Sequence, residues 1–384
     1  MGIRGTLAQN NNLKILHSYG AIVDDFEPSE ITVNDNIEHY DSQILENDLR
    51  IMLEGLEISK DVEKDSKAKL PFAFVRSEFV KNNNFTKINS NLKNSNLNIW
   101  SKIYKGSYMN GLFFTDYSIL EWISRLNYAT SVMIFNLMEA GIIQIPGTDE
   151  YKYSKERVSK RIAQTLNSSY RLLFRSIFSK DDITYGPAIY TLSKYGVKIV
   201  EIMIGENTFY HNSEIKPLYI QRKLSLNNWF CSMLNYFRDS IDVQGYGLDN
   251  TFESTNSSAA KAVVHAYINI NGQPVFAESY RNATTDYYKC TEKVQRLCIL
   301  ASDYSNLTIN SENVQMKKKP IIVVVGENKE HCKVLNELIG RIKTDTKIIY
   351  AIDEPIENDI ENAHFEFVDD EMISFDIKRC LTEE

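Results

Sequence analysis

The sequence predicts a multidomain protein of the α+β or α/β class, in which a helix-turn-helix region precedes an α/β sandwich. Its 384 residues are enough for two or three separate cores. Apolar residues recur at helical spacing between about residues 114 and 178, and farther along the chain short apolar runs alternate with helical patterns. We therefore expect an acidic N-terminal segment of uncertain fold, a helix-turn-helix region and an α/β domain with an acidic C-terminal tail, over residues 1–100, 101–210 and 211–384.

Residues 1–100 constrain the fold least. The sequence favours an amphipathic helix over residues 44–55 and a strand over residues 70–75. Residues 82–98 are rich in Asn, Lys and Ser, which indicates a loop or linker. The whole segment is an arm, a partner-binding piece or part of the helical region that follows, and the sequence does not choose among them.

A first helix-turn-helix unit is predicted directly after this segment. Apolar residues at helical spacing indicate a helix over residues 117–125. Thr130 and Ser131 have the side chains of a helix N-cap, so a second helix is expected from there to Ala140. Gly141 is suited to end that helix, because glycine adopts the left-handed conformation at low cost.

A second unit repeats this plan, with a helix over residues 158–163, a turn at residues 166–169 and a helix over residues 170–178. Residues 183–186 and 188–192 can then pair as a hairpin across Gly186 and Pro187, which would be the wing of a winged helix. The region is therefore expected to hold one winged helix-turn-helix unit or two in tandem.

Basic residues concentrate in the second unit. From residue 152 to residue 180 there are eight lysines and arginines and one acid, and eight minus one leaves +7 in a chain whose formal net charge is −8. A basic surface on a helix-turn-helix unit is the electrostatic feature of a DNA-binding protein, so double-stranded DNA is the expected partner. A solvated helix face or an unrelated helical hairpin is the alternative.

Three groups of residues are the predicted DNA contacts. The first unit would contact one DNA segment through Thr130, Ser131 and Asn136. The last helix of the second unit would read base edges or phosphates in the major groove through Ser168, Ser169, Arg171 and Arg175. Backbone phosphates would be neutralised by Lys152, Lys155, Arg157, Lys160 and Arg161.

The region after residue 211 alternates strands and helices, and the domain boundary is expected at residues 205–220. Asn271 and Gly272 are suited to the tight turn of a hairpin, and the apolar run at residues 321–325 indicates a strand buried on both faces. The expected helices cover residues 225–237, 287–300 and 331–341, and the expected strands cover residues 243–248, 261–270, 275–280, 320–325, 347–352 and 364–368.

This order of strands and helices is that of restriction-endonuclease-like nucleases. Such sites need an acid at a strand bend and a Glu-x-Lys or Asp-x-Lys on the next strand, because the carboxylates hold a divalent ion on the scissile phosphate. Here the position two residues after Glu278 is Tyr280, so the lysine is absent, and Lys289 or Lys293 could reach the site only from the next helix. Magnesium is therefore expected only if the domain cleaves DNA, and Glu278 is otherwise a structural hydrogen-bonding acid.

Several short motifs resemble the replication-relaxation family of Gram-positive plasmids and integrative elements. They are residues 190–196, similar to the family's Tyr-x-Leu-Thr-x-x-Gly, the helix start at residues 224–228, the strand at residues 276–278 and the segment at residues 320–335. The resemblance covers roughly residues 110–340, and it implies a winged helix coupled to a nuclease-like α/β domain with a role in plasmid replication and DNA relaxation. The family's Pro-Asp-Ala strand corresponds here to residues 259–262, which lack the aspartate.

Composition and motifs argue against a membrane protein, a secreted protein, a metal site and a nucleotide cofactor. No apolar run is long enough to span a membrane and the first residues lack an apolar signal core, so a cytoplasmic protein without membrane contact is expected. The five cysteines are scattered, which favours reduced structural thiols, and the six histidines show no metal-ligand spacing. No nucleotide-binding glycine motif occurs, so no cofactor is expected.

Three functions are left open. The first is a non-enzymatic, sequence-specific DNA-binding protein of a plasmid or mobile element, acting in replication, maintenance or transfer. A homodimer and replication or transfer proteins are its further candidate partners. The second is a metal-dependent nuclease or nicking enzyme on the same scaffold. The third is a protein-binding module whose winged helix packs on a partner.

Overall fold

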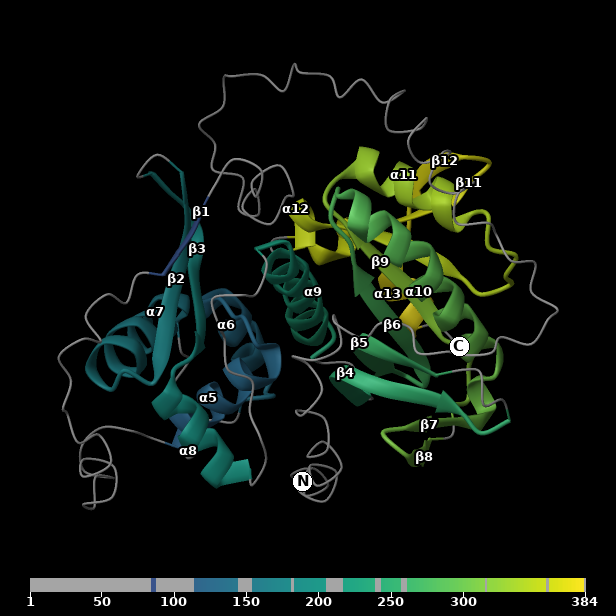
Figure 1. Cartoon of the computed structure of the whole chain (residues 1–384). Coiled ribbons are helices and arrows are strands. Elements are labelled where there is room, and N and C mark those ends of the chain that lie inside the picture. The colour runs from purple at the N-terminus through teal and green to yellow at the C-terminus, as the bar shows by residue number, and fades with distance from the viewer. Residues whose placement is uncertain are drawn as a thin grey trace.

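The computed structural model describes residues 84–87, 114–143, 154–180, 183–204, 217–238, 243–256, 261–314, 316–356 and 359–382. They form a helix-rich part with a small sheet and a larger part built on one wide sheet, and a long helix lies between the two parts (Figure 1). The chain is thus of mixed α/β class, as the sequence predicts. The elements expected at residues 44–55 and 70–75 lie outside the described residues.

Helices α5 (Phe114–Leu126) and α6 (Ser131–Glu139) confirm the first predicted pair of helices. Thr130 caps α6 as expected, because its hydroxyl accepts a hydrogen bond from the backbone N–H of Met133. Ala140 is the C-cap of α6, and Gly141 then adopts a φ of 70°, in the left-handed region.

The third helix of this part combines two geometries. Its first turns form α7 (Lys155–Lys160), and the chain continues directly as the π-helical segment η6 (Arg161–Ser169). The backbone N–H of Tyr170 closes the last wide turn on the carbonyl of Thr165. The turn expected at residues 166–169 is therefore wrong, because those residues are helical.

A three-stranded antiparallel sheet follows, in the order β1 (Asn84–Lys87), β2 (Leu173–Lys180) and β3 (Ile183–Leu192). The helix predicted over residues 170–178 is wrong, because that segment runs into β2, which pairs with β1 on one side and β3 on the other. The hairpin predicted across Gly186 is also wrong, since residues 183–192 form a single strand. Strand β1 lies in the segment predicted as a linker, and the second helix-turn-helix unit is not formed by the described residues.

Two contacts tie the small sheet to the helices. Ala129, in the link between α5 and α6, exchanges backbone hydrogen bonds of 3.1 and 2.8 Å with Tyr190 of β3. Helix α8 (Lys194–Ile204) packs closely on the chain that precedes β2, because a Cβ placed on Gly196 would lie 2.2 Å from the carbonyl oxygen of Leu172. Only glycine allows that approach.

The larger part is built on a nine-stranded sheet in the order β12-β11-β10-β9-β6-β5-β4-β7-β8. Strand β9 is parallel to both β6 and β10, and the other pairings are antiparallel. The strands are β4 (Val243–Ser254), β5 (Lys261–Ile270), β6 (Gln273–Ser279), β7 (Leu307–Ile309), β8 (Glu312–Val314), β9 (Ile321–Gly326), β10 (Ile348–Ile352), β11 (His364–Val368) and β12 (Glu371–Ser374).

The strands and helices expected after residue 211 are confirmed in type and approximate position. Asn271 and Gly272 form the β5–β6 turn with positive φ at both residues, 50° and 76°. Strand β9 is buried along its whole length, as the apolar run at residues 321–325 predicts. The helices are α9 (Pro217–Tyr236), α10 (Thr284–Ser302), α11 (Lys329–Ile339), α12 (Asp353–Ile356) and α13 (Ile377–Thr382).

Helix α9 is shared by the two parts of the chain (Figure 1). One apolar core extends from α5 and α6 through α9 to one face of the nine-stranded sheet, and a second core lies between the opposite face and helices α10 and α11. The amide of Asn227 on α9 donates to the carbonyls of Leu126 and Tyr128 at 2.7 and 2.8 Å, which fixes the link between α5 and α6. The boundary expected at residues 205–220 thus overlaps the start of a helix that belongs to both parts.

No helix among the described residues is long and apolar enough to cross a membrane. All five cysteines are free thiols, and Cys231, Cys290, Cys298 and Cys332 are buried. Burial raises the pKa of each of these four thiols, so they are protonated at neutral pH.

Candidate functional site

The third helix exposes most of the predicted phosphate contacts. Ser154 caps α7 by accepting the backbone N–H of Arg157 at 3.3 Å, and the buried Val158 holds the helix on the core. Lys155, Arg157 and Lys160 are exposed. The one acid of α7, Glu156, forms an ion pair of 2.7 Å with Lys160, so this helix carries three cations against one acid, a net charge of +2. Lys152 lies outside the described residues.

Arg161 is directed inward rather than toward a phosphate. Its Nε donates to one carboxylate oxygen of Asp116 at 2.8 Å, and a second guanidinium nitrogen donates to the other oxygen. Asp116, in the first turn of α5, is only 2% exposed. A bidentate pair on a buried carboxylate is strong and directional, so Arg161 fastens the third helix to the first.

Arg171 and Arg175 do not lie on a helix. Arg171 is the residue at which the chain leaves η6, with a φ of 57°, and its carbonyl accepts the hydroxyl of Ser193 at 2.7 Å. Arg175 lies on β2 opposite Tyr190. Burial raises the pKa of Tyr190, and the adjacent Arg175 offsets part of that rise. Both arginines are partly buried.

Of the remaining residues predicted to contact DNA, some are buried and the others are partly or fully exposed. Thr130 and Asn136 are 3% and 8% exposed, and the amide of Asn136 donates to the hydroxyl of Ser232 on α9 at 3.3 Å. Helix α6 therefore presents these two side chains to the protein interior, and Ser131 is partly exposed. Ser168 and Ser169 are exposed, with hydroxyls that donate to the carbonyls of Ala163 and Gln164 at 2.9 and 2.8 Å.

Glu278 occupies a gap between two strands. The pairing of β5 with β6 ends at Ala266 and Ala277, and the next residue of β6 is Glu278, which is 2% exposed. Its carboxylate accepts the backbone N–H of His265 at 3.1 Å and contacts Nδ1 of the same histidine. The Nζ of Lys293, on α10, lies 3.7 Å away. Burial would raise the pKa of Glu278, but the charges of His265 and Lys293 outweigh it and lower the pKa to about 2.

A second acid lies two strands away in the same sheet and is also paired. Asp249, on β4, has a φ of 53°, and its carboxylate accepts hydrogen bonds from Lys223 of α9 at 2.5 and 2.6 Å. Tyr280, in the place of the nuclease lysine, is buried. No group of three or more histidines, cysteines or acids that could hold a metal occurs among the described residues. The predicted nuclease position thus holds carboxylates whose charges are neutralised by protein cations.

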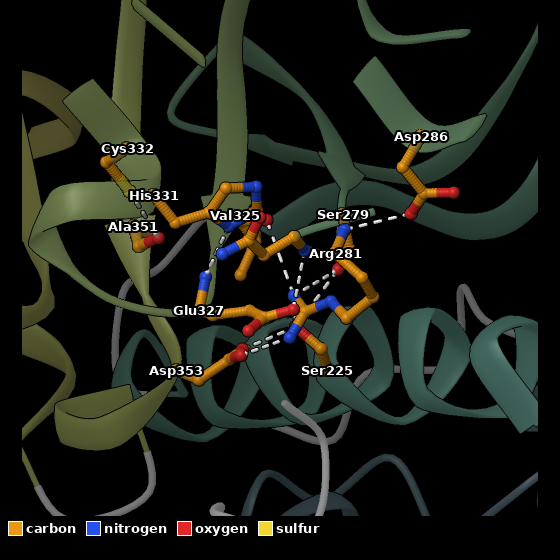
Figure 2. Close-up of polar contacts among 11 residues, drawn as sticks. Ser225, Ser279, Arg281, Asp286, Val325, Glu327, His331, Cys332, Ala351 and Asp353 are labelled. Atoms are coloured by element: carbon orange, nitrogen blue, oxygen red, sulfur yellow. Dashed lines mark hydrogen bonds and ion pairs between the residues drawn. The ribbon is translucent and has the colours of Figure 1, made fainter. Parts of the chain in front are cut away.

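A second polar cluster, which the sequence does not single out, lies at the carboxyl ends of the parallel strands (Figure 2). Arg281, just after β6, is fully buried and forms an ion pair with Asp353, just after β10. Its guanidinium also donates to the hydroxyls of Ser225 on α9 and Ser279 on β6, each at 2.8 Å. This edge is where parallel sheets usually bind ligands, and here the chain's own side chains fill it.

The same cluster extends to the loop after β9. The carboxylate of Glu327 accepts the backbone N–H of Asn282 at 2.6 Å, and the backbone N–H of Glu327 donates to Nδ1 of His331 at 3.0 Å. The backbone N–H of Arg281 donates to Asp286 at 2.9 Å. The only sequence signal is a charged residue after each of three apolar strands, and it does not reveal that these residues are adjacent.

The fold and these sites define a mixed α/β protein in which a basic helical unit and a sheet domain share one buried helix. Comparison with protein-family models, with curated proteins and with solved structures gives no match.

Proposed function

We propose that this chain is a DNA-binding protein and that residues 114–204 form a single winged helix. Support comes from the element order, in which three helices are followed by the antiparallel hairpin of β2 and β3. In addition, Ala129, which lies between the first two helices, pairs with Tyr190 of β3 as a short strand would. The third helix is the recognition element of such a unit. The sequence-based expectation assigned DNA contact to Arg171 and Arg175. In this proposal the exposed face of α7 makes that contact instead.

The observation that carries the proposal is the difference between the second and third helices. Helix α6 packs against α9 and directs Asn136 into the interior, whereas α7 exposes Lys155, Arg157 and Lys160. A net positive, exposed helix in a chain of net charge −8 gives a local attraction for phosphate, while the net charge of the whole chain disfavours DNA contact elsewhere.

The α/β domain supports binding rather than cleavage. Its order α9-β4-β5-β6-α10-β7-β8-β9 contains the elements of the nuclease-like order expected from the sequence, with the short strands β7 and β8 in addition. However, Glu278 and Asp249 are held by His265, Lys293 and Lys223. Carboxylates engaged in this way are poor ligands for a divalent ion, because binding would first require breaking buried ion pairs. The assignment to a plasmid or mobile element rests on the family resemblance alone.

The test is DNA affinity measured by fluorescence anisotropy as a function of salt. The triple variant Lys155→Ala, Arg157→Ala, Lys160→Ala should bind DNA much more weakly, and the slope of log affinity against log salt should fall by about 0.9 for each phosphate that is no longer neutralised. The matched control is Lys317→Ala, Lys318→Ala, Lys333→Ala, which removes three exposed lysines of the sheet domain, one of them paired with Glu330 as Lys160 is with Glu156.

The proposal fails if the wild-type chain does not bind DNA at low salt, or if both triple variants bind equally well. Cleavage of supercoiled plasmid in the presence of magnesium or manganese, abolished by Glu278→Gln, would overturn the non-enzymatic assignment. Fragments selected from plasmid and chromosomal DNA in the same binding experiment test the mobile-element assignment.

A further inference from the structure

Along the third helix, two rows of side chains at intervals of four residues each share the same degree of burial. Val158, Ile162 and Leu166 form the buried row. The exposed row consists of Glu156, Lys160, Gln164 and Ser168. In a uniform α-helix, a row at intervals of four winds steadily around the axis.

The change from α-helix to π-helix keeps these rows close to straight. Four residues exceed one turn of an α-helix, which holds 3.6 residues, so each step of four rotates a little too far. A π-helix closes its hydrogen bonds one residue later, so four residues fall short of its turn. The chain is α-helical up to Lys160 and π-helical from Arg161, and the two rotations oppose each other. The exposed row therefore stays on one face over both segments.

The side chains of the exposed row are not equally available. Lys160 and Glu156 form an ion pair, and the hydroxyl of Ser168 donates to the carbonyl of Ala163. The side-chain amide of Gln164 has no hydrogen-bond partner among the described residues. It lies at the middle of the row and offers a donor and an acceptor side by side.

We propose that Gln164 is the residue through which this chain discriminates among DNA sequences, an inference that rests on the DNA-binding function proposed above. A glutamine amide is complementary to the N6 and N7 groups of adenine in the major groove, where it forms a bidentate contact. Lys160 and Arg157, one and two turns earlier, supply phosphate attraction that is independent of sequence. The π-helical segment places Gln164 in line with Lys160, on the side away from the core.

The experiment is selection of bound duplexes from a random-sequence DNA library, followed by affinity measurements on selected and unrelated duplexes. The wild-type chain should select a motif with an adenine at one fixed position. Gln164→Ala should bind the selected duplex about tenfold to a hundredfold more weakly and lose the preference at that position, with its affinity for unrelated DNA unchanged. Arg157→Ala should weaken binding to both duplexes by the same factor, and Asn362→Ala, which removes an exposed amide of the sheet domain, should change neither.

Each outcome decides a separate claim. A wild-type chain that binds DNA without sequence preference, or a Gln164→Ala variant that selects the same motif, overturns the role of Gln164 and leaves the DNA-binding function standing. A wild-type chain that binds no DNA overturns the function itself. Circular dichroism of the variant separates these outcomes from misfolding, which is not expected because the side chain is exposed.

Discussion

At the scale of single residues, the buried polar side chains are defined by what they contact. Arg281 is fully buried, and Asp353 is the acid that pairs with it. Removing one member of a buried ion pair leaves an uncompensated charge in the interior, which costs far more than losing a pair at the surface. The cluster in Figure 2 therefore joins α9, β6 and the end of β10, and removing any one of its charged side chains would leave a buried partner without its counter-charge.

We expect Asp353→Asn to lower the free energy of unfolding by about 3 to 5 kcal/mol, because Arg281 would keep its charge without its main counter-charge. Urea denaturation monitored by circular dichroism measures the change. The control is Asp345→Asn, which removes the exposed acid of the surface pair with Lys319 and should leave the midpoint unchanged. Equal midpoints for the two variants would show that the Arg281 cluster contributes no net stability.

His364 makes the stability of the chain dependent on pH. The indole N–H of Trp229 donates to Nε2 of His364 at 3.0 Å, so Nδ1 carries the proton that is donated to the carbonyl of Ile360, also at 3.0 Å. Burial lowers the pKa of His364 from 6.5 to about 4, although the bond to Ile360 favours the charged form. In the folded protein the ring is therefore neutral at physiological pH.

The sign of the effect follows from this lowered pKa. Between pH 6.5 and about 4 the unfolded chain binds a proton at this histidine and the folded chain does not, so stability is present above pH 6.5 and is lost as the pH falls. We expect His364→Gln to remove about 1.4 kcal/mol per pH unit from the slope in that window. Denaturation curves of both proteins from pH 7 to pH 4.5 measure it, and parallel slopes would contradict the neutral buried ring.

At the scale of elements, the sequence predicts best where the signal is local. Strand β5, its Asn271–Gly272 turn and the buried strand β9 each follow from adjacent residues, and the structure confirms them. Strand β2, in contrast, could not be predicted from its own residues. Its apolar residues are compatible with a helix or a strand, and the choice is made by pairing with β1, which is distant in sequence, and with β3. The left-handed backbone of Arg171, which ends the preceding helix, has no glycine to signal it.

The candidate sites show the same division. Glu278 can be singled out from the sequence because it lies on a predicted strand, but its partners come from different elements: His265 from β5 and Lys293 from α10. Likewise, exposure on α7 follows a helical pattern, whereas the inward turn of Arg161 depends on Asp116 in α5. Side-chain roles that depend on the meeting of separate elements could not be predicted from local pattern.

At the scale of the whole molecule, helix α9 makes the two parts one folding unit. Asn227 satisfies two buried carbonyls in the link between α5 and α6, while Ser225 and Trp229, on the same helix, bond to Asp353 and His364 of the sheet domain. The apolar core is continuous across this helix. Such a shared core favours cooperative unfolding.

We expect Asn227→Ala to destabilise both parts together, because it leaves the carbonyls of Leu126 and Tyr128 buried without their donor, at a cost of about 1 to 3 kcal/mol. Native-state hydrogen exchange is the measurement: the slowest amides of α5 and of β9 should lose protection by the same amount. Loss confined to α5 would show instead that the helical part opens independently of the sheet.

The position of α9 also has a practical consequence for dissecting the protein. The boundary expected from the sequence falls just before or at the start of α9. A fragment that ended before α9 would lack the helix that packs on α6, and one that began with α9 would expose to water the apolar side chains that this helix directs toward the helical part. Neither piece would have a closed interior, so both would tend to associate or precipitate. Reagents meant to separate the roles of the two parts should therefore be point variants of the intact polypeptide.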